Sequence, residues 1–209
     1  MQQFDHLLEL GASHMILCDA DLVFLSSPAS LVGKPGVSAH TVDKPNPGHD
    51  LLRRLLDAAG FKDEPLSAPT RFQPEGTTHR LNCNGGLYAL DRASLQTLAP
   101  AWKRWSAYCL SRAAILGPKL MHSDQLGFML GMLETGLAFA RLPEHANFPT
   151  HFPAWNYAQT PDAISSLHYH NNVLDDGRLG PTGNPVIDRW IDQANRMLQD
   201  RAIPLVGAK

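Results

Sequence analysis

Residues 14–21 read His14-Met15-Ile16-Leu17-Cys18-Asp19-Ala20-Asp21. The apolar run at 15–18 is typical of a buried strand, and side chains two apart in extended backbone point to the same side. We therefore expect Asp19 and Asp21 to face one spot. Neighbouring carboxylates repel each other unless a cation lies between them, and Mg²⁺ or Mn²⁺ prefers oxygen ligands. The stretch predicts a divalent-metal site at a strand end; the alternative is two aspartates that only cap a turn.

The same stretch fits a second chemistry. Asp19-Ala20-Asp21-Leu22-Val23 matches the nucleophile motif of the haloacid-dehalogenase-like phosphatases, in which the first aspartate is phosphorylated. That chemistry also needs a lysine and a downstream acidic pair after an apolar strand. The available pair is Asp175-Asp176, which follows a polar segment and precedes Gly177. We expect this pair to lie in a turn, which disfavours the phosphatase.

Size and charge restrict the classes of partner. The chain has 209 residues, which suits a single domain with a sizeable core. Its formal net charge of −2 gives no basic field for nucleic acid or an anionic membrane. Its three cysteines are scattered and favour a reducing compartment over a disulfide framework. No signal-peptide pattern or membrane-length apolar run occurs, so we expect a cytoplasmic protein without a transmembrane segment.

Strand and helix patterns alternate along the chain. Apolar runs predict strands at 15–18, 36–41, 87–90, 137–140 and 163–168, and helical periodicity predicts helices at 4–10, around 51–56, after Asp91, at 124–134 and at 185–201. Asp91, Ser123 and Asn184 are placed to cap the helices that follow them. This order predicts one α/β domain over 1–209, a mixed sheet with helices on both faces. Ligands of such folds bind at the carboxyl ends of strands.

Three further polar motifs could serve a binding site. In Asn82-Cys83-Asn84-Gly85-Gly86, amides offer donors and acceptors to sugar hydroxyls and glycines allow close approach; a turn before a strand is the alternative. Asp124-Gln125 opens a helix, where an acid is also favoured by the helix dipole. His168-Tyr169-His170 places two imidazoles on one face, and either can bind a metal ion or simply be an ordinary histidine.

In this order, the four motifs resemble those of the GT-A-fold glycosyltransferases, in particular the glycogenin-like family-eight group. The resemblance implies that Asp19, Asp21 and His168 hold Mn²⁺, or Mg²⁺, with the donor diphosphate. It implies that Asn82, Asn84, Gly85 and Gly86 lie along the donor sugar. It also implies that Asp124 and Gln125 lie near the reacting face of that sugar, as candidate catalytic residues.

Two departures from the family pattern are visible. The family follows its C-terminal histidine with a glycine and a phosphate-binding lysine, whereas here Asn171-Asn172-Val173-Leu174 follows, with Arg178 as a candidate substitute. The family also has a nucleotide-binding strand–helix–strand unit before its aspartate pair, and only eighteen residues precede Asp19. We therefore expect an N-terminally incomplete GT-A-like domain that binds nucleotide-sugar poorly by itself.

The sequence thus predicts metal-dependent transfer of a sugar from a nucleotide-diphosphate sugar, a UDP-sugar in the first instance, to a hydroxyl of a saccharide or protein. Retention of the anomeric configuration is implied by the family-eight resemblance; inversion would instead use a carboxylate base such as Asp124. The alternatives are a phosphatase with Asp19 as nucleophile, and an inactive domain that binds sugar or protein. An uncovered strand edge would also favour self-association.

Overall fold

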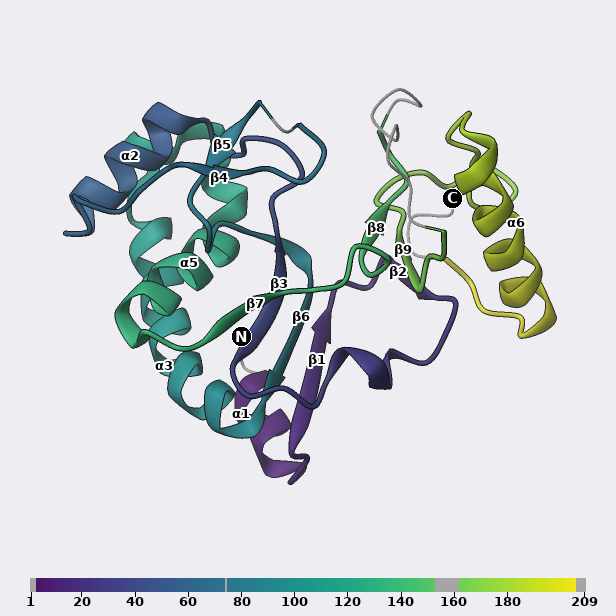
Figure 1. Cartoon of the computed structure of the whole chain (residues 1–209), viewed down its shortest axis with the longest axis horizontal. Helices are drawn as coiled ribbons and strands as arrows, with labels where there is room; N and C mark the ends of the chain where they lie inside the picture. The colour runs from purple at the N-terminus through teal and green to yellow at the C-terminus, as the bar shows by residue number, and fades with distance from the viewer. Residues whose placement is uncertain (1–2, 74, 153–161, 206–209) are drawn as a thin grey trace. The chain divides into compact units, whose positions relative to one another are not determined.

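The computed structural model describes residues 3–73, 75–152 and 162–205. The chain forms two compact units (Figure 1). The first unit comprises Met1–Leu17 and Val32–Arg141, and the second comprises Cys18–Leu31 and Leu142–Lys209. Because two compact units can belong to one domain, the single catalytic domain over 1–209 stays a prediction.

A four-stranded sheet forms the centre of the first unit. Its strands lie in the order β1 (His14–Cys18), β6 (Cys83–Asp91), β3 (Val37–Thr41) and β7 (Phe139–Arg141). β3 runs antiparallel to β6 and parallel to β7. This arrangement confirms the predicted α/β class with a mixed sheet.

The helices of the first unit bury aromatic side chains against this sheet. They are α1 (Gln3–Glu9), α2 (His49–Ala58), α3 (Arg92–Leu110), α4 (Ala113–Leu116) and α5 (Ser123–Thr135), with a short 3₁₀ helix, η2 (Gly117–His122), and a small hairpin of β4 (Ala68–Pro69) and β5 (Thr77–Thr78). Trp102 of α3 packs on Phe4, Tyr88 and Phe128, with ring centroids 5.0–5.2 Å apart. Trp102 is therefore a core residue.

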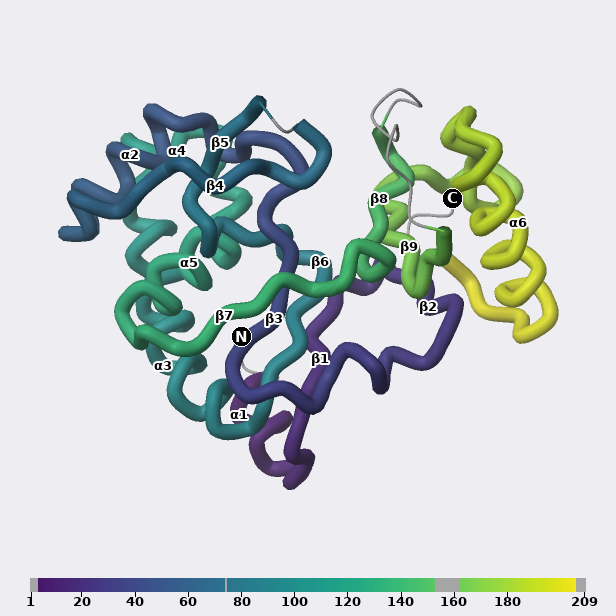
Figure 2. Tube along the Cα trace, in the orientation of Figure 1, coloured from purple at the N-terminus to yellow at the C-terminus, as the bar shows by residue number. Residues whose placement is uncertain are grey.

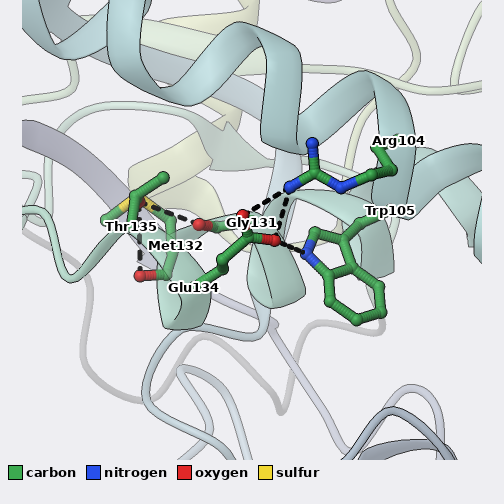
Figure 3. Close-up of polar contacts among 6 residues, drawn as sticks. All are labelled: Arg104, Trp105, Gly131, Met132, Glu134 and Thr135. Atoms are coloured by element: carbon green, nitrogen blue, oxygen red, sulfur yellow. Dashed lines mark hydrogen bonds and ion pairs between the residues drawn. The ribbon is translucent and has the colours of Figure 1, made fainter.

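Helices α3 and α5 lie side by side in the first unit, as the Cα trace in Figure 2 shows. Two glycines of α5 allow their close approach: a Cβ on Gly127 would lie 2.6 Å from the backbone nitrogen of Ser106, and one on Gly131 would lie 3.2 Å from that of Trp102. At the exposed end of the contact, the Arg104 guanidinium and the Trp105 indole both donate to the Glu134 carboxylate (Figure 3).

The second unit contains a three-stranded sheet. β9 (Ser166–His168) lies between β2 (Leu22–Phe24) and β8 (Phe148–Pro149), antiparallel to β2 and parallel to β8. The unit also contains the 3₁₀ helix η1 (Pro28–Leu31) and the long helix α6 (Pro185–Asp200). The Asn184 side chain accepts a hydrogen bond from Val186 N at 2.9 Å, so the predicted cap is confirmed and the predicted helix 185–201 ends one residue earlier.

Two local predictions are wrong. Ser123 does not cap α5: it is the first helical residue, and its hydroxyl donates backward to the carbonyl of Leu120, while His122 occupies the cap position. Strand β6 begins at Cys83, so Asn84, Gly85 and Gly86 lie within the strand and not in a turn before it. Within the described residues, no helix is both long and apolar enough to span a membrane.

We expect Gly127→Ala to lower the free energy of unfolding by about 1–3 kcal/mol, because the new methyl group meets backbone atoms of α3 that cannot move independently. The matched control is Gly131→Ala, whose new methyl group would lie 3.2 Å from Trp102 N. The higher helix propensity of alanine contributes about 1 kcal/mol and offsets this milder contact, so the free energy of unfolding should stay close to that of the wild type. Urea denaturation of both variants checks this. Equal effects of the two substitutions would contradict the close approach at Gly127.

Hydrogen bonding by Arg104 lowers the pKa of Glu134 below its usual value; slight burial opposes this shift and the Trp105 indole adds to it. The unfolded chain therefore takes up a proton on Glu134 at a higher pH than the folded protein does. The stabilisation by this contact is complete above the pKa that Glu134 has in the unfolded chain, and it is lost as the pH falls through the lower pKa of the folded protein. We expect Glu134→Gln to destabilise by less than about 1 kcal/mol at pH 7, since the contact is exposed. Denaturation at pH 7 and pH 3 should show that the free energies of unfolding of Glu134→Gln and the wild type differ less at pH 3.

Candidate functional site

Four polar side chains of the second unit meet at the start of β2 and the end of β9. Asp19 and Asp21 lie in the turn between β1 and β2. The register pairs Leu22 with His168, and Tyr169 N donates to the Asp21 carbonyl at 3.1 Å. The antiparallel pairing therefore places the aspartate turn beside His168 and the residues that follow it.

Both carboxylates approach the same imidazole nitrogen. His168 Nε2 lies 3.2 Å from Asp21 Oδ1 and 3.9 Å from Asp19 Oδ2. On the other side, His170 Nδ1 lies 3.6 Å from Asp21 Oδ2. We call Asp19, Asp21, His168 and His170 the acidic–imidazole cluster. It contains the three residues that the sequence analysis assigns to the metal.

Burial differs across the cluster. The His168 side chain is only 2% exposed, that of Asp21 is 23% exposed and that of Asp19 is 55% exposed. The cluster thus has a buried nitrogen at its base and an open carboxylate at its rim. Burial lowers the pKa of His170, although the nearby Asp21 carboxylate partly opposes this. This lowered pKa favours the neutral form of His170, the form in which imidazole binds metal ions.

His170 joins the cluster through an unusual backbone conformation. Its φ of +49° lies in the left-handed region, which costs a residue with a side chain about 1–3 kcal/mol. The turn that contains it is closed by Asn172 N donating to the Tyr169 carbonyl at 2.8 Å. Its ring lies 3.8 Å from that of His168 and 4.0 Å from that of His151, measured between centroids. In the sequence, His170 follows His168 by two residues, and this spacing indicated it as a second candidate metal ligand.

The cluster fits a single metal ion. One ligand atom from each of Asp21, His168 and His170 lies within 4.8 Å of the others. Transition metals hold imidazole nitrogen and carboxylate oxygen at about 2.0–2.2 Å, so ligand atoms around one ion are separated by about 4 Å or less. Mixed nitrogen and oxygen ligands suit Mn²⁺ better than Mg²⁺.

The remaining predicted site residues belong to the first unit, and several are held by internal hydrogen bonds. The Asn82 amide is buried and donates to the Asn46 carbonyl at 3.1 Å and to the Thr78 hydroxyl at 2.8 Å. The Asn84 amide donates to Asp43 at 2.7 Å, and its oxygen accepts from Gly86 N at 2.8 Å. These bonds fix the segment, so Asn82 mainly orders the loop around Asn46.

The structure brings the glycine motif and the Asp-Gln motif together. A Cβ on Gly85 would lie 2.7 Å from Gln125 Nε2, so β6 and the first turn of α5 touch at this point. Gln125 is half-buried there, whereas the Asp124 side chain is exposed. The Asp124 backbone carbonyl accepts a hydrogen bond from the Trp102 indole at 2.7 Å. Of the predicted pair, Gln125 is the one that contacts the glycine motif.

Residues required by the alternatives have other partners. Asp175 and Asp176 lie in a turn, as expected, and Arg178 Nη2 lies 2.7 Å from Asp176 Oδ2. One member of the acidic pair of the phosphatase hypothesis, Asp176, is therefore engaged in a local ion pair. The same ion pair occupies Arg178, the candidate substitute for the family's lysine.

Comparison with known proteins gives limited similarity. No protein-family model matches the chain, and no curated protein matches it. A solved structure of mouse xyloside xylosyltransferase 1, apo form, is similar to it with 14% identity and a TM-score of 0.43, over 81% of this chain and 62% of that chain. The chain thus spans less than two thirds of the length of that structure.

We expect a double-mutant cycle to detect the contact between Gly85 and Gln125. Gly85→Ala should cost less than about 1 kcal/mol, because the flexible glutamine can move away. In a Gln125→Ala background the clash is absent, and the cost should fall by about 0.5 kcal/mol or more. Chemical denaturation of the four proteins measures this. Strictly additive effects would show that the methyl group introduced at position 85 does not touch the Gln125 side chain.

Proposed function

We propose that the chain transfers a sugar from a nucleotide-diphosphate sugar to an acceptor hydroxyl in a metal-dependent reaction. The acidic–imidazole cluster carries this proposal. It brings the Asp21 carboxylate and the imidazoles of His168 and His170 within 4.8 Å of one another, with Asp19 Oδ2 3.9 Å from His168 Nε2. The order of the four sequence motifs supports the same function.

The residues of the cluster would have different roles. Asp21, His168 and His170 hold the ion, and the more exposed Asp19 completes the cluster at its open side. Held by these residues, a divalent ion would supply positive charge to the diphosphate leaving group. The imidazoles supply ligand atoms without adding to the negative charge of the two carboxylates, so the site does not repel the anionic donor as strongly as an all-carboxylate site would.

In this proposal the first unit binds the donor sugar. Asn84, Gly85 and Gly86 would line the sugar, Asn82 would hold that segment in place, and Asp124 and Gln125 would act near the reacting carbon. The proposal includes retention of the anomeric configuration. NMR observation of the product anomer, with a donor of known configuration, distinguishes retention from inversion with Asp124 as the base.

We expect Asp21→Asn to weaken Mn²⁺ binding at least tenfold, because even partners of metal ligands contribute about 10–100-fold to affinity. The matched control Asp176→Asn changes an aspartate of the same unit that is paired with Arg178, and it should bind Mn²⁺ as the wild type does. Titration followed by Mn²⁺ electron paramagnetic resonance measures both affinities.

The transferase itself is tested by consumption of UDP-sugars with and without EDTA. Release of UDP that requires Mn²⁺ and is lost in Asp21→Asn supports the proposal. Vanadate-sensitive hydrolysis of a phosphate ester, lost in Asp19→Asn, would instead establish the phosphatase. Equal Mn²⁺ binding by Asp21→Asn and the wild type would refute the metal site.

A further inference from the structure

The second unit contains a cavity of about 550 Å³ beside the acidic–imidazole cluster. This volume lies within the range of about 300–1,000 Å³ that is usual for small-molecule sites. Its polar lining consists of two hydroxyls, two amides and two imidazoles, from Thr150, Thr182, Asn171, Asn172, His151 and His170. We call it the polar cavity.

The charge of the lining indicates the class of ligand. Among the described residues that line it, none is a lysine, arginine, aspartate or glutamate. Sites for phosphate or carboxylate groups usually carry arginine or lysine, which bind such groups through charge-assisted hydrogen bonds. Hydroxyls and amides are instead neutral partners for the hydroxyl groups of a ligand. Because the Asn172 amide and the Thr182 hydroxyl already donate within the protein, these two side chains can only accept from such a ligand. Phe152 and Pro181 add apolar surface, which suits the carbon–hydrogen face of a sugar ring.

The walls of the polar cavity are fixed by the protein's own hydrogen bonds. The Asn172 amide donates to the carbonyls of Thr150 and Gly180 at 3.2 and 2.8 Å. The Thr182 hydroxyl donates to Asp188 of α6 at 2.8 Å. A ligand therefore meets a largely preorganised site, which reduces the entropy lost on binding.

His170 connects the polar cavity to the cluster, because it lines the cavity while its Nδ1 lies 3.6 Å from Asp21. We propose that the polar cavity binds an uncharged saccharide and, resting on the proposed function, that this saccharide is the acceptor. The donor is anionic and is matched by the metal ion. The acceptor is the neutral substrate of the same reaction, and a cavity without cations suits it.

Saturation-transfer NMR on the full chain tests this, with maltose, cellobiose and lactose as neutral probes and glucose 1-phosphate as the charged one. Asn171→Trp fills the polar cavity from an exposed position, and Leu174→Trp is the matched control at an exposed site outside the lining. We expect at least one neutral disaccharide to bind, at least fivefold more weakly to Asn171→Trp and unchanged to Leu174→Trp. Mn²⁺ affinity should be the same in all three proteins, which also shows that they fold.

Other outcomes separate this inference from the proposed function. If no neutral disaccharide binds, if Asn171→Trp binds as well as the wild type, or if glucose 1-phosphate binds more tightly, the cavity inference is overturned. Mn²⁺-dependent UDP release would then still stand as evidence for the transferase. If a disaccharide binds in the cavity but adding it fails to increase UDP release, the acceptor assignment is overturned.

Discussion

Because β2 and β9 run antiparallel, the turn that precedes β2 lies beside the end of β9. One strand pairing thus brings two carboxylates to a buried imidazole, with Asp21 Oδ1 3.2 Å from His168 Nε2. The turn after β9 then directs His170 toward both Asp21 and the polar cavity. Were β2 shifted by one residue, its side chains would exchange faces and the cluster would be lost. The chemistry proposed for the second unit therefore depends on the register of three residue pairs.

The fold was predictable where local signals decide it. The apolar run before Asp19 forms β1, and Asp91 caps α3 by accepting from Ser94 N. Both depend on residues close in sequence. The start of β6 was missed because asparagine and glycine disfavour strands, whereas here Cys83 pairs with Thr41 of β3 across a register shift and so extends the strand over them. Likewise, Ser123 has the residue type of a cap, but the preceding 3₁₀ helix draws it into α5.

The candidate site was predictable in its residue types more than in its geometry. The sequence predicted that Asp19 and Asp21 face one spot on extended backbone; both carboxylates do approach one nitrogen, but from the turn between β1 and β2. The position of His170 depends on its positive φ, which no spacing rule indicates for a histidine. The polar cavity is formed by segments that are distant in sequence, and its lining follows no local pattern. The division into two units also arises from distant pairings and leaves no compositional boundary.

Residues 18–31 belong to the second unit although the segments on either side of them belong to the first. During synthesis this segment leaves the ribosome well before its partner strand β9, which lies far along the chain from it. Contacts between segments so far apart form late in folding, because the entropy of closing a long loop is lost before any stabilising contact is made. The acidic–imidazole cluster is therefore assembled only after β9 has been made and has paired with β2. A chain in which this pairing has not formed carries both aspartates without the cluster, so the metal binding proposed for the cluster would report on the pairing of β2 with β9.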